Sequence, residues 1–291
     1  MELSNLTLLN GDIFDANALG AIALDSQGKA PFQSALLHEF DRVVMLLRDD
    51  GGANRLVGNM IAGELRTQTL RVGLSMLKRS IITGDNNELI TCLLEGDIIW
   101  DPQEVLEQLR AEVISFEPPL RERILFIEFA RFLHMYVKSK RYLQAGCTMD
   151  SYNCILMALY HWARMEVGEA GHYPTPAVWE QVKSLNNSVY KLYEELTISG
   201  ETMDQRIQLV QLACEFSLVS KMGDCCKWFL DLLKERKGPW SIEEILEFSE
   251  LKYVEAELPF VLRKLASRSL IREIASWSDA GGGGYRVRYT F

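Results

Sequence analysis

The spacing of apolar residues changes from strand-like to helical at Phe116-Glu-Pro-Pro. Before this point, residues 18–24, 40–47 and 69–77 are aliphatic, partly β-branched runs, a pattern that favours strands. After it, apolar residues recur at helical spacing from Ile124 onward. Two adjacent prolines stop regular structure and restrict the residue before them. The sequence therefore predicts an α/β domain over residues 1–118, with a mixed sheet, followed by an all-α region.

The all-α region divides into two parts. Helical periodicity continues over residues 119–222, with one break at residues 168–175, where two glycines and a proline interrupt it. This stretch is expected to be a helical bundle. Gly223 is expected to open the final segment, whose first helix would cover residues 225–236.

The last fifty residues favour a small module of two helices and a hairpin. Residues 240–246 and 258–268 have helical spacing, and residues 270–274 and 285–291 alternate as strands around Gly281–Gly284. Pro259 suits the first turn of a helix, where its missing N–H has no intrahelical partner. This order predicts a C-terminal winged helix-turn-helix over residues 223–291.

Composition narrows the class of protein. No apolar run reaches the roughly 18 residues that a membrane span needs. The N-terminus shows no positive start followed by an apolar stretch, so a secretory signal is not expected. The six cysteines lack the paired spacing of zinc or redox sites, and we interpret them as ordinary thiols. We expect a cytoplasmic protein with no membrane partner.

Charge is distributed unevenly along the chain. The net charge of −9 belongs to residues 1–223, whereas residues 224–291 hold 11 basic and 11 acidic residues. Within that tail, residues 259–291 carry six Lys or Arg against two acids. The positive end thus falls where a winged helix would contact phosphates.

A pair of acids marks the start of the second predicted strand. Glu39 and Asp41 are two residues apart, so on a strand both would point to one face. Paired carboxylates can hold Mg²⁺, which in turn binds nucleotide phosphates. Ser26 follows the first predicted strand in a polar turn. The alternative is a solvated strand start, where carboxylates are routine.

This arrangement resembles the nucleotidyltransferase superfamily, whose loop begins Gly-Ser and whose next strand carries Asp-x-Asp. The whole chain is similar to a bacterial nucleotidyltransferase-like family with a helical substrate-binding-like domain and a C-terminal helix-turn-helix. The stretches that carry the closer likeness are Leu94-Glu-Gly-Asp-Ile-Ile-Trp-Asp, Tyr160-His-Trp-Ala-Arg, Val178-Trp-Glu-Gln-Val and Val189-Tyr-Lys-Leu-Tyr-Glu-Glu-Leu. The resemblance implies a nucleotide site at Ser26, Glu39 and Asp41, with Mg²⁺ held by the two acids.

The departures from the superfamily pattern predict weak or absent catalysis. Asp25 stands where active members have the glycine that lets the backbone approach phosphates, and its charge would repel them. Glu39 replaces the first aspartate, and residues 69–77 contain no third carboxylate. Two-metal transfer depends on fixed ligand geometry. An active Mg²⁺-dependent nucleotidyltransferase remains the alternative.

The helical region offers a second candidate site. Asn153, His161 and Arg164 can line one helix face, and a His with an Arg could hold a phosphate or an acidic group of a substrate. The competing interpretation is a core histidine with one hydrogen bond and an arginine whose head reaches the surface.

Basic residues near the C-terminus suggest contact with DNA. Lys264 and Arg268 share a helix face, and Arg286 and Arg288 alternate on the last strand. Three functions remain open: a nucleotide-binding regulator that contacts nucleic acid, an active enzyme, and a protein-interaction scaffold. We favour the regulator.

Overall fold

A computed structural model describes residues 17–25, 40–49, 56–62, 64–236, 238–278 and 284–291. The chain forms two compact units: residues 1–117 with 175–177, and residues 118–174 with 178–291. The boundary between the two units at residues 117 and 118 coincides with the proline pair. Pro118 and Pro119 occupy the first turn of a long helix, where proline is tolerated. None of the helices in the described part of the chain combines the length and the apolar character needed to cross a bilayer.

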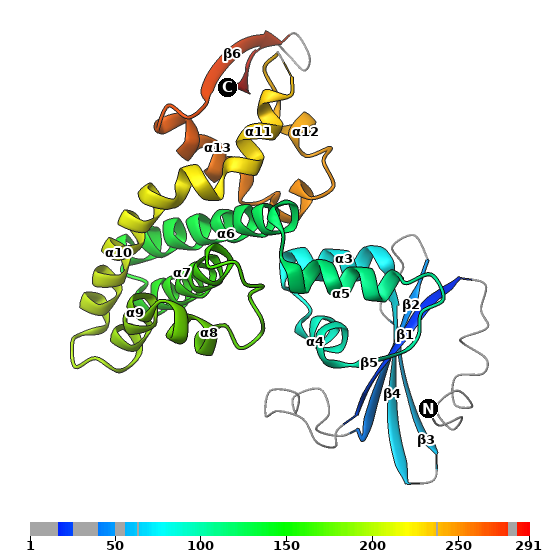
Figure 1. The fold of residues 1–291 in the computed structure, drawn as a ribbon. Coiled ribbons are helices and arrows are strands. Elements are labelled where there is room, and N and C mark those ends of the chain that lie inside the picture. The colour runs from blue at the N-terminus through cyan, green and yellow to red at the C-terminus, as the bar shows by residue number, and fades with distance from the viewer. Residues whose placement is uncertain (1–16, 26–39, 50–55, 63, 237, 279–283) are drawn as a thin grey trace. The chain divides into compact units, whose positions relative to one another are not determined.

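The first unit is built on a mixed five-stranded sheet (Figure 1). Its strands are β1 (Ala18–Asp25), β2 (Arg42–Arg48), β3 (Leu56–Ala62), β4 (Leu65–Gly73) and β5 (Asp97–Trp100). They lie in the order β3-β4-β2-β1-β5, in which only the β2–β4 pair is parallel. The centres of β1 and β2 are buried on both faces, which explains why both read as continuous apolar runs.

In the described part of the first unit, three helices pack against the sheet. They are α3 (Leu74–Thr83), α4 (Asn87–Glu95) and α5 (Val105–Ser115). A Cβ on Gly20 would come within 2.5 Å of Leu106 Cδ1 in α5, and one on Gly96, which ends α4, would clash with Ile22 Cγ2 of β1 and lie 3.0 Å from the Ala23 carbonyl oxygen. Glycine is therefore required at both positions for the helices to approach the sheet this closely.

Two features of the first unit differ from the sequence prediction. The predicted strand over residues 69–77 is wrong beyond Gly73, because α3 begins at Leu74 and buries Leu77 and Ile81 at helical spacing. The sequence analysis also missed β3. This strand has a neighbour on one side only, and Val57 and Ile61 are exposed, so the pattern of burial that marks a strand is absent.

The second unit is mainly helical. Its helices are α6 (Pro118–Gln144), α7 (Thr148–Glu169), α8 (Val178–Leu185), α9 (Asn187–Ile198), α10 (Met203–Cys225), α11 (Lys227–Lys234), α12 (Ile242–Ile245) and α13 (Leu258–Ser267), with a 3₁₀ turn at Leu251–Val254. The antiparallel pair α6 and α7 forms its centre, and α10 crosses both (Figure 1). Phe126, Phe129 and Phe132 of α6 are fully buried there.

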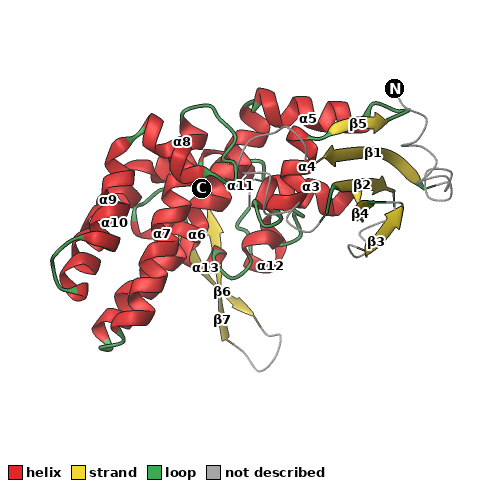
Figure 2. Ribbon diagram, turned by 90° about the horizontal axis from the view of Figure 1, so that it is seen from below, coloured by secondary structure: helices red, strands yellow, loops and turns green. Residues whose placement is uncertain are grey.

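The C-terminal part of this unit has the predicted order of two helices and a hairpin. Ser241 and Glu244 form a reciprocal capping box that starts α12. Strands β6 (Arg272–Ser278) and β7 (Gly284–Thr290) pair antiparallel, and Trp240 bridges to Tyr289. The hairpin extends away from the helices of its unit (Figure 2).

The predicted break at Gly223 is wrong. This residue lies inside α10, which continues to Cys225, and α11 follows from Lys227. No described atom lies within 4 Å of a Cβ built at Gly223, so packing against a neighbouring element does not require glycine there. One exposed glycine costs a helix about 1 kcal/mol, which a 23-residue helix tolerates.

Candidate functional site

The structure places Asp25 and Arg42 side by side across β1 and β2. Their backbones are paired in the antiparallel register, and the Asp25 carboxylate accepts two hydrogen bonds from the guanidinium, at 2.5 and 3.0 Å. Such a bidentate pair compensates much of the negative charge of Asp25. The repulsion of phosphate expected from Asp25 is therefore weaker than the sequence alone suggests.

Asp41 supports the sheet where β2 begins. Its Oδ2 accepts the backbone N–H of Arg66 at 2.7 Å, and its own N–H donates to the Arg66 carbonyl at 2.9 Å. Ser26 and Glu39 lie outside the described residues. The nucleotide and Mg²⁺ site at Ser26, Glu39 and Asp41 thus stays a prediction.

The described residues alone do not suffice for a metal site. Asp25 is paired with Arg42, one oxygen of Asp41 is engaged by Arg66, and the adjacent strand β4 carries no Asp or Glu. Within the described ranges, no group of three or more His, Cys, Asp or Glu side chains could hold a metal ion. A Mg²⁺ site at β2 would therefore need at least one ligand from residues outside these ranges.

In the second unit, His161 and Arg164 meet on a buried acid that the sequence analysis did not identify, Glu128 of α6. His161 Nδ1 lies 2.7 Å from Glu128 Oε2, and Arg164 Nε donates to Oε1 at 2.6 Å. Arg164 Nη1 also donates to the carbonyl of Pro174, at 3.2 Å. We name Glu128, His161 and Arg164 the buried triad.

The buried triad is closed to solvent and strongly polarised. Glu128 is 0% and Arg164 2% exposed, so the predicted surface position of the Arg164 head is wrong. Burial opposes the charge on Glu128, but Arg164 and then His161 outweigh it and lower the pKa of Glu128 to about 2. Asn153 is exposed on α7 and has no contact with the triad among the described interactions. The structure thus joins two of the three predicted substrate residues.

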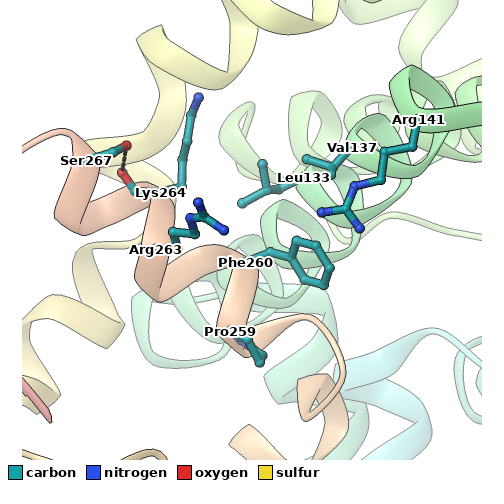
Figure 3. A pocket seen from close by; sticks show the side chains of 8 residues that line it. All are labelled: Leu133, Val137, Arg141, Pro259, Phe260, Arg263, Lys264 and Ser267. Atoms are coloured by element: carbon teal, nitrogen blue, oxygen red, sulfur yellow. Dashed lines mark hydrogen bonds between the residues drawn. The ribbon is translucent and has the colours of Figure 1, made fainter. Parts of the chain in front are cut away.

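A groove lies between α6 and α13 of the second unit (Figure 3). Its volume is about 580 Å³. The eight lining residues are Leu133, Val137 and Arg141 of α6 and Pro259, Phe260, Arg263, Lys264 and Ser267 of α13. We call it the α6–α13 groove.

The α6–α13 groove combines cations with an apolar floor. Arg141 and Arg263 reach from opposite helices toward the space beside Phe260 (Figure 3), and Arg141 lies 5.8 Å from the centre of that ring. His134 stacks on Phe260 at 4.7 Å and holds Glu257 at 3.2 Å. None of the eight lining residues is acidic. The groove is therefore suited to an anion with an apolar part.

An acidic side chain lies close to the groove but is already paired. Glu215 of α10 accepts hydrogen bonds from Tyr136 Oη at 2.9 Å and Lys140 Nζ at 3.3 Å. Tyr136, then Lys140, and more weakly Lys264 lower the pKa of Glu215. Because Tyr136 and Lys140 already engage the Glu215 carboxylate, we expect Lys264 to stay available to a ligand in the groove.

Two of the four residues predicted to contact DNA lie in or directly after α13, and the other two lie on β7. Lys264 lines the α6–α13 groove, whereas Arg268 is exposed at the end of α13. Arg286 and Arg288 lie on one side of β7, as predicted, because their partners Ser276 and Ile274 are two residues apart. Arg288 also donates to the Pro239 carbonyl at 3.4 Å and lies 3.9 Å from Glu244.

Comparison with known proteins identifies both units. Residues 9–123 match the family model for nucleotidyltransferase-like domains, and residues 122–221 match that for the YgxA-like substrate binding domain. The uncharacterised protein YgxA of Bacillus subtilis (strain 168) is 27% identical over 275 residues, which are 94% of this chain and 92% of that protein. The crystal structure of a nucleotidyltransferase-like protein from Exiguobacterium sibiricum 255-15 superposes with a TM-score of 0.83 at 28% identity, covering 98% and 97% of the two chains. This chain therefore carries a stretch that matches a nucleotidyltransferase-like domain, followed by one that matches a YgxA-like substrate binding domain.

Proposed function

We propose that this protein binds a phosphate-bearing small ligand, such as a nucleotide, in the α6–α13 groove. The observation that carries the proposal is that Arg141, Arg263 and Lys264 all line one groove whose lining includes no acid. Guanidinium and ammonium groups are the side chains that bind phosphate most strongly. The match of residues 122–221 to a substrate-binding model supports a small ligand, because Arg141 lies in that range.

The dimensions of the groove agree with a small ligand. Its volume of about 580 Å³ lies within the roughly 300–1,000 Å³ of known small-molecule sites. Leu133, Val137 and Phe260 provide apolar surface for a base or another ring, and the groove lining also contains three cationic side chains. A ligand with a ring and one or more phosphates would use both parts.

We further propose that the nucleotidyltransferase-like unit transfers nucleotides weakly or not at all. Strand β4 lies beside β2 and has no carboxylate, and Asp25 occupies the position of the loop glycine. An active Mg²⁺-dependent enzyme that uses Ser26, Glu39 and Asp41 is the alternative. Turnover of labelled nucleoside triphosphates with Mg²⁺ that disappears in Glu39→Ala/Asp41→Ala would establish that alternative.

Removing two cations should weaken ligand binding. We expect Arg263→Ala/Lys264→Ala to raise the dissociation constant for ATP at least tenfold, because each lost charge-assisted hydrogen bond contributes about 1.5–3 kcal/mol. Isothermal titration calorimetry measures it directly. Arg268→Ala is the matched control, since Arg268 lies on the same helix but outside the groove lining. Equal affinity of the double variant and the wild type would exclude the groove as the site.

The screen must include more than one phosphate-bearing ligand. ATP, GTP, a nucleoside monophosphate and inorganic phosphate, each with and without Mg²⁺, separate recognition of the ring from recognition of the phosphate. A ligand that binds only the folded protein raises its melting temperature, so thermal shift gives a first ranking. If none of these ligands shifts the transition and none binds by calorimetry, the groove proposal is wrong.

A second candidate function is regulation through nucleic acid. We propose that α11 to β7 form a winged helix, on the order of their elements, with the β6–β7 hairpin as the wing. Arg268 and Arg272 are exposed at the end of α13 and the start of β6, and Arg286 is exposed on β7. Exposed arginines on a helix and its adjacent hairpin are suited to the phosphates of a duplex.

Duplex binding would depend on residues outside the groove. If the module binds DNA, Arg268→Ala/Arg286→Ala should weaken binding and flatten its salt dependence by about one unit per lost phosphate contact. ATP binding should stay unchanged in that variant. Fluorescence anisotropy with a labelled duplex at two salt concentrations measures both effects. No binding at low salt by the folded protein would favour the protein-interaction scaffold instead.

A further inference from the structure

Helix α10 carries large apolar side chains on the face that its own unit leaves exposed. Leu209, Leu212, Phe216 and Val219 are between 43% and 78% exposed. Their spacing of three, four and three residues places them in one row along the helix. The opposite face buries Ile207, Val210, Cys214 and Leu218 toward α6 and α7. We name the exposed row the α10 seam.

The spacing of the α10 seam is that of a helix that pairs with another helix. Apolar residues that alternate three and four apart occupy the a and d positions of a heptad, where each side chain fits between four of a facing helix. Solitary exposed apolar residues are normal on a protein surface, but a continuous row is not. A facing helix with the same spacing is the partner that fits this row.

We propose that the α10 seam pairs with the α10 seam of a second copy of this chain. A two-fold axis near Cys214 would set Leu209 against Val219 and Leu212 against Phe216 of the other copy. Antiparallel pairing also brings the N-terminus of each helix near the C-terminus of the other, which their dipoles favour. The spacing of three, four and three residues is the same in both directions along the helix. The same surface can therefore form the contact on both copies of the chain.

The area of the α10 seam is adequate for the core of such an interface. Its four side chains are 46%, 69%, 78% and 43% exposed, so most of their apolar surface is available for the centre of a contact. A stable interface buries roughly 800 Å² on each partner, with an apolar core and a polar rim. Gln205, Gln208 and Ser220 are exposed neutral residues along the seam that would supply the rim.

The charges beside the α10 seam permit a second copy to approach. Glu215 precedes Phe216 and is the acid closest to the middle of the row. Tyr136 and Lys140 already hold its carboxylate at 2.9 and 3.3 Å. Two copies therefore meet without placing an uncompensated carboxylate in the contact.

The mass of the protein in solution tests the proposal. Sedimentation velocity and light scattering should give twice the 33.2 kDa of one chain at concentrations above the dissociation constant. Leu212→Glu/Phe216→Glu should raise that constant at least about 100-fold, because it places four carboxylates in the dimer contact. Ile114→Glu on α5 is the matched control, since Ile114 is 68% and Leu212 69% exposed.

Two results would overturn the proposal. The first is a wild-type protein that stays a monomer up to its solubility limit. The second is a dimer that persists with unchanged affinity in Leu212→Glu/Phe216→Glu. If circular dichroism shows that this variant is unfolded, Leu212→Ala/Phe216→Ala repeats the test without buried charge, and at least a tenfold weaker dimer is then expected.

Discussion

Replacing Glu128 with Gln is expected to lower the free energy of unfolding of the second unit by about 3–5 kcal/mol. Gln keeps the shape of the side chain but removes the charge that Arg164 and His161 face. Arg164 is 2% exposed and cannot lose its proton inside a protein. The variant therefore leaves an uncompensated buried cation. Urea unfolding followed by the helical circular dichroism signal measures the loss.

Two control variants separate charge from packing. Glu128→Leu/Arg164→Met removes both charges together and should lose much less stability, because apolar groups of similar volume often replace a buried ion pair without penalty. Asp231→Asn disrupts the exposed pair with Lys234 and should change stability little. If Glu128→Gln is as stable as the wild type, the buried triad is not closed in solution.

The buried triad bears on the α6–α13 groove because both involve α6. Glu128 joins α6 to α7, and Arg164 extends the connection to the Pro174 carbonyl in the loop before α8. Leu133, Val137 and Arg141 follow along the same helix and form one wall of the groove. The triad thus helps to hold that wall in place, while the α13 wall is held by its own buried face of Leu258, Val261, Leu262 and Leu265.

Much of the fold could be predicted from local patterns. The strands β1 and β2 and the helices α6 and α13 follow from apolar spacing, and a proline fits the first turn of each of these two helices. The error at residues 74–77 arose because an aliphatic run of that length suits either a strand or a helix. The burial of Leu77 and Ile81 on one helix face, which the structure shows, distinguishes the helix from the strand.

The site residues were harder to predict because their partners are remote in sequence. Arg141 and Lys264 lie on different helices, and no spacing rule connects them. Glu128 did leave a signal, since it is a single acid inside the run Ile124-Leu-Phe-Ile-Glu-Phe-Ala. An acid with apolar neighbours on every side of a helix must be paired when buried, and His161 and Arg164 were already candidates. The location of Glu39 and Ser26 outside the described residues leaves the nucleotide prediction at β2 open.

Acid should destabilise the second unit in a defined range of pH. The pKa of Glu128 is about 2 in the folded protein, against an ordinary value of 4.5. A lowered folded pKa means that stability is present above pH 4.5 and is lost as the pH falls toward 2, because the unfolded chain binds the proton first. The difference corresponds to roughly 3 kcal/mol from this one group.

The pH dependence of Glu128→Leu/Arg164→Met tests this assignment. Without Glu128 the variant lacks the group that takes up the proton on unfolding, so its stability should fall less steeply than that of the wild type between pH 5 and pH 2. Glu166 and Glu215 also have a lowered pKa and remain in both proteins, so they contribute equally to the two curves. Urea unfolding at a series of pH values gives both curves. Parallel curves would show that Glu128 titrates normally in the folded protein, and the buried triad would then not account for the acid sensitivity of this unit.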